Sequence, residues 1–196
     1  MPIKHAFFSP EQVLFGIGAI EELGVCVNSF IGKKVFIVTD TLVAGLDSFK
    51  GVEISLKEKN IDYTLYTEVD ANPTDVQVDR GAKLYKESNC DVLVAIGGGS
   101  SIDSAKAIGI VVNNGGSIRD YEEYDSVVKP IPPLIAIPTT SGSGCEVSAW
   151  AVITNTQKKY KFCPGGVRII PKIALVDPEL TASMPPVIQL PQAWML

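Results

Sequence analysis

Three glycines followed by a serine, at residues 97–100, are the residue types in this sequence that most directly suggest chemistry. The apolar run 91–96 precedes them and a helix-like pattern follows, so the sequence predicts a strand, a glycine turn and a helix start. The first N–H groups of a helix lack partners inside it and the helix dipole adds positive potential, so a phosphate gains several hydrogen bonds there. Three successive glycines cost more backbone entropy than a simple turn requires. We therefore interpret the run as an anion-binding turn rather than a plain connection.

Three charged residues near this turn have a structural interpretation, and two of them also have a functional one. Asp40 ends the β-rich run 33–40, where a carboxylate can bind a ribose 2′-hydroxyl and repel the extra phosphate of NADP, which favours NAD. It also suits the N-cap of the next helix, and the spacing leaves the two interpretations even. Asp103 lies one turn into the helix after the glycines, where a carboxylate complements the dipole. Lys106 either reaches a phosphate or is a solvated helix residue.

A second segment rich in hydroxyls and glycine, 138–146, follows another apolar run. Its hydroxyls could grip a nucleotide, although an ordinary surface loop has a similar composition. Cys145 lies in this segment and could be a nucleophile. A nucleophilic thiol needs a base to activate it, and no histidine other than His5 is present in the sequence. We interpret Cys145 as structural.

Strand and helix patterns alternate through residues 33–140. This alternation predicts a doubly wound, Rossmann-like α/β fold with a parallel sheet, in which ligands bind beyond the carboxyl ends of the strands. Residues 1–15 are expected to form two short extended pieces, and residues 150–177 a small β-hairpin region around Pro164. The expected strands are 33–40, 63–66, 91–96 and 132–140, and the expected helices are 20–30, 46–60, 76–88 and 101–112.

Composition favours a small-molecule partner. The 196 residues suffice for one α/β domain, and a net charge of −5 argues against nucleic acid as a partner. We expect no membrane association, because the apolar runs are too short to cross a bilayer. The amino terminus has no secretion-signal pattern and the four cysteines are scattered, so we expect reduced thiols and a cytoplasmic location.

Four motifs in order resemble the iron-containing alcohol dehydrogenase family. The resemblance runs from about Phe7 to Pro186 and corresponds to the amino-terminal half of a family member. It implies an NAD-binding α/β domain over 1–186, with the helical carboxyl-terminal domain absent. The motifs are Asn72-Pro-Thr, the glycine turn with Asp103 and Lys106, Pro-Thr-Thr-Ser-Gly-Ser-Gly-Cys-Glu-Val at 138–147, and Asp-Pro-Glu-Leu-Thr at 177–181.

The resemblance also implies roles for individual residues. Asp40 would select NAD, and Gly97, Gly98, Gly99 and Ser100 would hold the pyrophosphate. The rest of the cofactor cleft would be lined by Asn72, Asp103, Thr139, Thr140 and Ser143. Positions near the nicotinamide-ribose and adenine sides match Ser148, Trp150, Lys161 and Leu180. The implied activity is NAD-dependent oxidation of a primary alcohol or reduction of an aldehyde, with Fe²⁺ or Zn²⁺ as Lewis acid.

No catalytic residue and no metal ligand is assigned within this sequence, because the resemblance places the metal site in the other half. A complete enzyme would be a homodimer or a higher oligomer. The substrate stays open among ethanol, butanol, a propanediol and lactaldehyde.

The last ten residues, 187–196, diverge from the family. Family members continue with Thr-Gly-Met-Asp-Ala-Leu, whose aspartate is a metal ligand. The codons of 192–195 can spell Thr-Gly-Met-Asp-Ala in a shifted frame. We therefore expect a frameshifted tail on a truncated, catalytically inactive chain.

Two alternatives remain. One is a non-catalytic NAD-binding module. The other is a relative of glycerol dehydrogenase or dehydroquinate synthase, although the motifs at 138–147 and 177–180 fit the alcohol dehydrogenases better.

Overall fold

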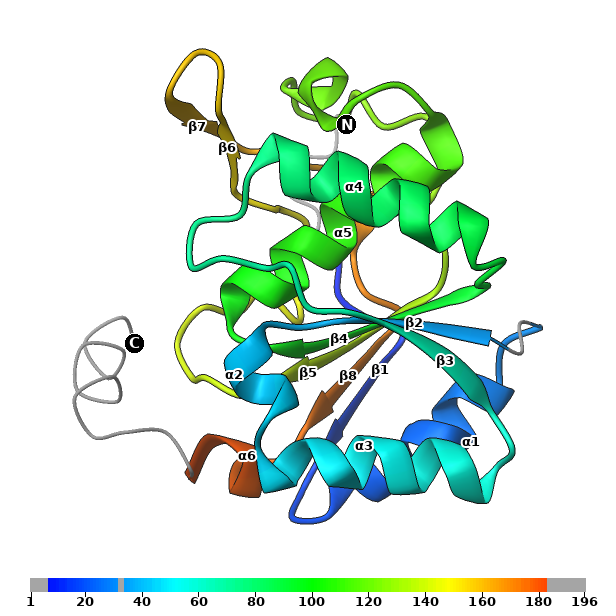
Figure 1. Ribbon diagram of the computed structural model, residues 1–196. Coiled ribbons are helices and arrows are strands. Elements are labelled where there is room, and N and C mark those ends of the chain that lie inside the picture. Colours follow the sequence, from blue (N-terminus) through cyan, green and yellow to red (C-terminus); the bar gives the residue numbers. More distant parts are fainter. Residues whose placement is uncertain (1–6, 32–33, 183–196) are drawn as a thin grey trace, which may run out of the picture.

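A six-stranded parallel sheet forms the centre of the protein. The computed structural model describes residues 7–31 and 34–182. In space the strand order is β1-β8-β5-β4-β2-β3, and every pairing in this sheet is parallel (Figure 1). The strands are β1 (Gln12–Phe15), β2 (Lys34–Val38), β3 (Asp62–Tyr66), β4 (Val92–Gly97), β5 (Leu134–Pro138) and β8 (Ile173–Val176).

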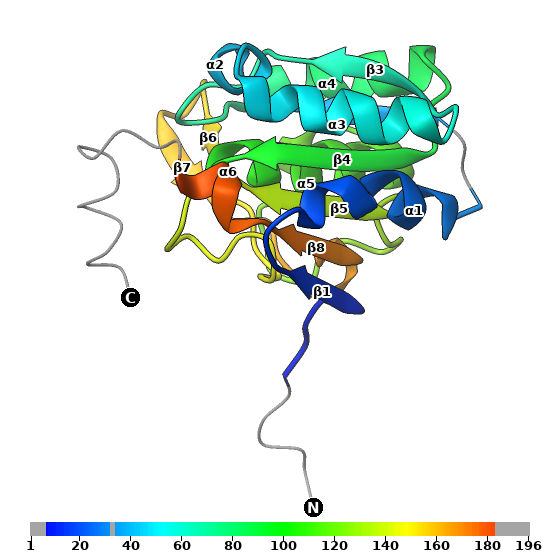
Figure 2. The ribbon, with the colours of Figure 1, turned by 90° about the horizontal axis from the view of Figure 1, so that it is seen from below.

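Helices cover both faces of the sheet. Helices α4 and α5 lie on one face, and α1, α3 and α6 lie on the other (Figure 1). The second view shows both helices running along the sheet, α3 between β3 and β4 and α1 in front of β5 (Figure 2). The helices are α1 (Leu23–Asn28), α2 (Thr41–Ala44), α3 (Asp47–Glu58), α4 (Asp75–Glu87), α5 (Gly99–Asn114) and α6 (Pro178–Ala182), and the 3-10 turns are η1 (Ala19–Glu22), η2 (Ile118–Tyr121) and η3 (Val167–Ile169).

The apolar strands supply two cores because successive side chains point to opposite faces. In β2, Phe36 and Val38 pack toward α4 and α5, whereas Val35 and Ile37 pack toward α1 and α3. All four are fully buried. Burial on both faces explains the continuous apolar runs of the central strands. The doubly wound parallel sheet expected from the sequence is confirmed.

The direction of winding reverses between β2 and β4. The chain passes outward from β2 to β3, returns to β4 beside β2, and then continues to β5 on the other side. Doubly wound proteins bind ligands at such a reversal, where the loops after neighbouring strands separate. Asp40 follows β2 and Gly97 ends β4, so both candidate residues lie at this point.

Several element boundaries differ from the sequence expectation. Helix α5 begins at Gly99, two residues earlier than expected. Of the two extended pieces expected in residues 1–15, the described residues contain one strand, β1, and residues 1–6 lie outside the described part of the chain. The hairpin of β6 (Ile153–Asn155) and β7 (Tyr160–Phe162) is confirmed, but its turn precedes Pro164. Residues 173–176 are wrongly assigned to the hairpin region, because they join the main sheet as β8.

The tail 187–196 lies outside the described residues. Within the described part of the chain, no helix is long and apolar enough to cross a membrane.

Candidate functional site

The glycine turn joins β4 directly to α5. Gly97 has φ +145°, and a Cβ added there would lie 2.4 Å from Ser101 Oγ. Gly98 is the N-cap of α5 and provides no side-chain cap hydrogen bond. The turn therefore leaves first-turn N–H groups of a 16-residue helix for an external acceptor. This geometry suits a phosphate.

The hydroxyl-rich loop after β5 packs against the turn. A Cβ on Gly98 would lie 3.4 Å from the Thr140 side chain, and one on Gly99 would lie 3.3 Å from Ser143 Cβ. The N–H of Thr139 donates to the Gly97 carbonyl at 2.9 Å. Larger residues in place of these glycines would fill the space between the two loops.

Asp40 caps α2, which confirms its N-cap interpretation. Its Oδ1 accepts a hydrogen bond from the Val43 N–H at 2.9 Å. Its Oδ2 lies 3.8 Å from the position of a Cβ built on Gly97, so the carboxylate also faces the glycine turn. The capping role leaves Oδ2 directed toward the site, and the ribose interpretation stays a prediction.

The loop 70–74 connects the glycine turn to the β6–β7 hairpin. Ser100 Oγ donates to the Ala71 carbonyl at 2.8 Å. Lys161 Nζ, on β7, donates to Asn72 Oδ1 at 2.7 Å. The N–H of Thr154, on β6, donates to the Pro73 carbonyl at 2.8 Å. Three candidate residues that are far apart in the sequence, Asn72, Ser100 and Lys161, are therefore joined through the loop 70–74.

Both interpretations of Lys106, as a phosphate-binding or a solvated side chain, are wrong. The side chain does not reach the turn and does not contact solvent. Its side chain is completely buried. Its Nζ donates to the Ser148 carbonyl at 2.8 Å, to Ser148 Oγ at 3.0 Å and to the Trp150 carbonyl at 2.8 Å. The ammonium group has three hydrogens and three acceptors, which makes burial of the charge tolerable.

Asp103 is also inside the protein. Its Oδ2 accepts a hydrogen bond from the Val152 N–H at 3.0 Å. Burial raises the pKa of this carboxyl, opposed by the Val152 N–H, Lys106 and Cys145. Both ionisable residues of the glycine motif therefore bind the segment 148–152.

Trp150 is about half exposed and packs against Tyr124, with ring centroids 4.7 Å apart. The pair rests on Gly165, because a Cβ there would lie 2.6 Å from the indole ring. Leu180, by contrast, is buried in the core cluster that α1 and α3 share. The candidate residues thus lie on both faces of the sheet edge, with the glycine turn between them.

Sequence reasoning missed Asp75, the first residue of α4. Its side chain is fully buried, and its Oδ2 lies 2.9 Å from Arg119 Nε. Both oxygens also accept from the Thr156 N–H in the hairpin turn at 3.2 Å. The available signal was the Thr74 to Gln77 spacing, which forms a capping box and marks the start of α4.

The Cys145 thiol fits a structural role. Burial raises its pKa to about 11 and the Asp103 carboxylate adds to the shift, so the thiol is protonated at neutral pH. A protonated thiol is a poor nucleophile. In the described ranges 7–31 and 34–182, no group of three or more His, Cys, Asp or Glu residues could hold a metal ion.

Stability should depend on the protonation of Lys106. Burial lowers its pKa from 10.5 to about 8, against the raising effects of Asp103, Cys145 and Glu146. Between these two values the unfolded chain binds more protons than the folded protein, so stability rises with pH. From about pH 7.5 to about pH 9, Lys106 should add about 1 kcal/mol to the free energy of unfolding. Urea unfolding across this range should show the rise as a difference between wild type and Lys106→Met; equal slopes would contradict the assignment.

The fold and the site define a class of protein, the doubly wound α/β proteins with a glycine turn at the reversal of winding. The chain belongs to the iron-containing alcohol dehydrogenase family, whose model matches residues 10–178. The family expected from the motifs is thus confirmed.

Two curated relatives and one solved structure show the extent of the similarity. The chain is 45% identical to the choline dehydrogenase of Bacillus subtilis, over 93% of this chain and 46% of the relative. It is 41% identical to the NAD-dependent methanol dehydrogenase of Bacillus methanolicus, over 91% and 47%. A crystal structure of 1,3-propanediol oxidoreductase superimposes with a TM-score of 0.94 at 30% identity, covering 97% of this chain and 50% of that one. The chain spans about half the length of these relatives.

Proposed function

We propose that this chain is the NAD-binding half of a dehydrogenase that interconverts a primary alcohol and an aldehyde. The observation that carries the proposal is the line of candidate residues across the carboxyl edge of the sheet, with the glycine turn at its centre. The family membership and the NAD-dependent relative support the same cofactor.

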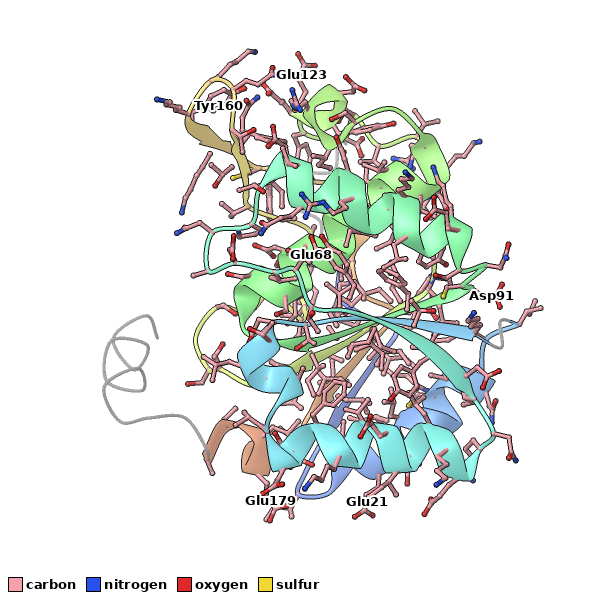
Figure 3. The ribbon with its side chains drawn as sticks, viewed as in Figure 1. Glu21, Glu68, Asp91, Glu123, Tyr160 and Glu179 are labelled. Carbon is pink, nitrogen blue, oxygen red and sulfur yellow. The ribbon has the colours of Figure 1, made fainter. Side chains whose placement is uncertain are left out.

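The two faces of the sheet edge suggest the orientation of the cofactor. Asp40 caps α2, whose Val43 packs in the same core cluster as Leu180, the cluster of α1 and α3; this side suits the adenosine end, because a carboxylate after the second strand binds an adenosine ribose. Lys161, which bonds to Asn72, lies on the hairpin whose Ile153 and Phe162 pack in the core cluster of α4 and α5, and Trp150 bonds to Lys106 of α5 through its carbonyl; these residues would contact the nicotinamide ribose end. Figure 3 shows Tyr160, the neighbour of Lys161, and Glu179, the neighbour of Leu180, on opposite faces of the sheet.

The pyrophosphate would then bind at residues 97–100, between the two ends. The bound nicotinamide ring supplies the hydride acceptor in alcohol oxidation. The described residues bind and orient this cofactor in the proposal, and they provide no donor set for the divalent metal of the family. No catalytic step is therefore assigned to them.

Isothermal titration of the 196-residue chain with NAD tests this proposal. We expect saturable binding that ADP displaces, since ADP carries the adenosine and the two phosphates. A folded chain that shows no heat of binding with NAD would contradict the proposal.

A non-catalytic NAD-binding module is the second candidate, and the lack of a metal-ligand group in the described part of the chain favours it. An assay of NADH formation with ethanol and added Fe²⁺ or Zn²⁺ tests whether the chain alone is catalytic. Turnover would exclude the non-catalytic module, whereas NAD binding without turnover is the expected result for the chain alone and fits both candidates.

Asp40→Ser should shift cofactor preference toward NADP. Serine retains an N-cap acceptor for the Val43 N–H but removes the charge that would repel a 2′-phosphate. We expect the ratio of the NADP and NAD dissociation constants to fall by about tenfold, which is about 1.4 kcal/mol. Titration with both cofactors measures the ratio.

Asp40→Ala is the matched control, because it removes both the charge and the cap. It should shift the ratio equally while lowering stability further by about 1 kcal/mol. An unchanged ratio in both variants would show that Asp40 does not face the ribose.

A further inference from the structure

We propose that Asp103 and Lys106 are positioning residues that hold the segment 148–152 against α5 on the nicotinamide side of the site. They act through this segment and do not themselves contact the cofactor. The inference rests on the proposed function for the identity of the cofactor, whereas the contacts that carry it belong to the protein alone.

The Lys106 contacts are unusually complete for a buried lysine. Two of its three acceptors are main-chain carbonyls, those of Ser148 and Trp150, at 2.8 Å each. A lysine whose purpose is to bind phosphate would leave donors free and would reach the glycine turn. Here the donors are used on the segment 148–152, so the lysine fixes the path of that backbone.

Asp103 fixes the same segment one turn earlier on α5. It accepts from the Val152 N–H at 3.0 Å, and only 6% of the residue is exposed. Lysine and aspartate together therefore hold a carbonyl at 148, a carbonyl at 150 and an N–H at 152. The chain bends at Ala149, and the carbonyls of Ser148 and Trp150 both lie within hydrogen-bond distance of the single ammonium group.

One rigid helix links the turn and the held segment. Helix α5 begins at Gly99, so the N–H groups offered to the pyrophosphate and the two positioning side chains are on the same element. The segment leads directly into β6, whose hairpin carries Lys161. The other charged or titratable groups that act on Lys106 are Cys145 and Glu146, both on the loop before the segment. Holding the segment thus sets the distance between the pyrophosphate turn and the nicotinamide end.

Variants that break each contact test this assignment. Lys106→Met removes the three donors at similar length, and Asp103→Asn retains an oxygen acceptor while it removes the charge. Ser148→Ala is a milder third variant that removes one acceptor and is used if Lys106→Met does not fold. Lys86→Met is the matched control, because Lys86 Nζ also donates to a main-chain carbonyl, that of Val111 at 3.2 Å, at the far end of α5 from the turn.

Two measurements separate positioning from general stability. Amide hydrogen exchange of the chain without cofactor should speed up at 150–152 in Lys106→Met, and not in Lys86→Met. Titration should show NAD binding weakened by about tenfold, while ADP binding changes by less than about twofold, because ADP does not reach the nicotinamide end.

The outcomes are distinguishable from failure of the proposed function. Unchanged exchange at 150–152 in the folded variants would overturn the inference, with or without cofactor binding. Equal weakening of NAD and ADP would also overturn it, since the residues would then act on the whole site. A wild-type chain that binds neither ligand contradicts the proposed function, and the exchange experiment still decides whether the two residues hold the segment.

Discussion

Gly97→Ala should lower the free energy of unfolding by about 3 kcal/mol and remove measurable NAD binding. At φ +145° an alanine is strained, which costs about 1–3 kcal/mol. Its Cβ would also lie 2.4 Å from Oγ and 2.9 Å from Cβ of Ser101, a buried residue in the first turn of α5. Relief of this contact moves the start of the helix, whose N–H groups are expected to bind the pyrophosphate. Urea unfolding and titration with NAD measure the two effects.

Gly115→Ala separates strain from overpacking. Gly115 has φ +83° at the carboxyl end of α5, and a Cβ there meets no atom within 4 Å. This variant should lose about 1–2 kcal/mol from backbone strain alone and keep NAD binding. If both variants lose the same stability and both bind NAD, the close contact at Ser101 has no consequence and the interpretation of the turn fails.

The glycine turn was predictable because its signal is local. Apolar strand, glycines and helix start follow one another in the sequence, and the first-turn N–H groups need no distant partner to create an anion site. The parallel sheet followed equally well from the continuous apolar runs, as Val35 to Val38 illustrate with alternate packing on two faces. Local patterns of this kind determine elements and the ends at which they present ligand groups.

The environment of Lys106 could not be predicted from local patterns. Its type and position predict a solvated or phosphate-binding side chain, and the contacts that reverse this lie more than 40 residues away. The assignment of residues 173–176 to the hairpin region was wrong for the same reason, because these residues join the main sheet by pairing with β1 and β5. Long-range partners decide burial, and sequence spacing does not contain them.

Asp75→Ala should destabilise the protein by about 3 kcal/mol, although Asp75 is not among the expected cofactor contacts. The carboxylate is fully buried, and its removal leaves the partly buried Arg119 without its partner at 2.9 Å. It also leaves the N–H of Thr156 unsatisfied and weakens the start of α4, where Oδ1 accepts from the Val76 N–H. Removing one member of a buried ion pair typically costs about 3–5 kcal/mol, and the partial exposure of Arg119 places this pair at the lower limit.

Asp47→Ala is the matched control for charge. Asp47 and Lys50 form an exposed pair at 2.7 Å on α3, and such pairs contribute little to stability. Urea unfolding should therefore separate the two aspartates clearly, and similar losses in both variants would contradict a special role for Asp75. Because Asp75 joins α4 to the turn of the hairpin that carries Lys161, Asp75→Ala should also weaken NAD more than ADP. Equal weakening of the two ligands would mean that the hairpin does not contact the nicotinamide end.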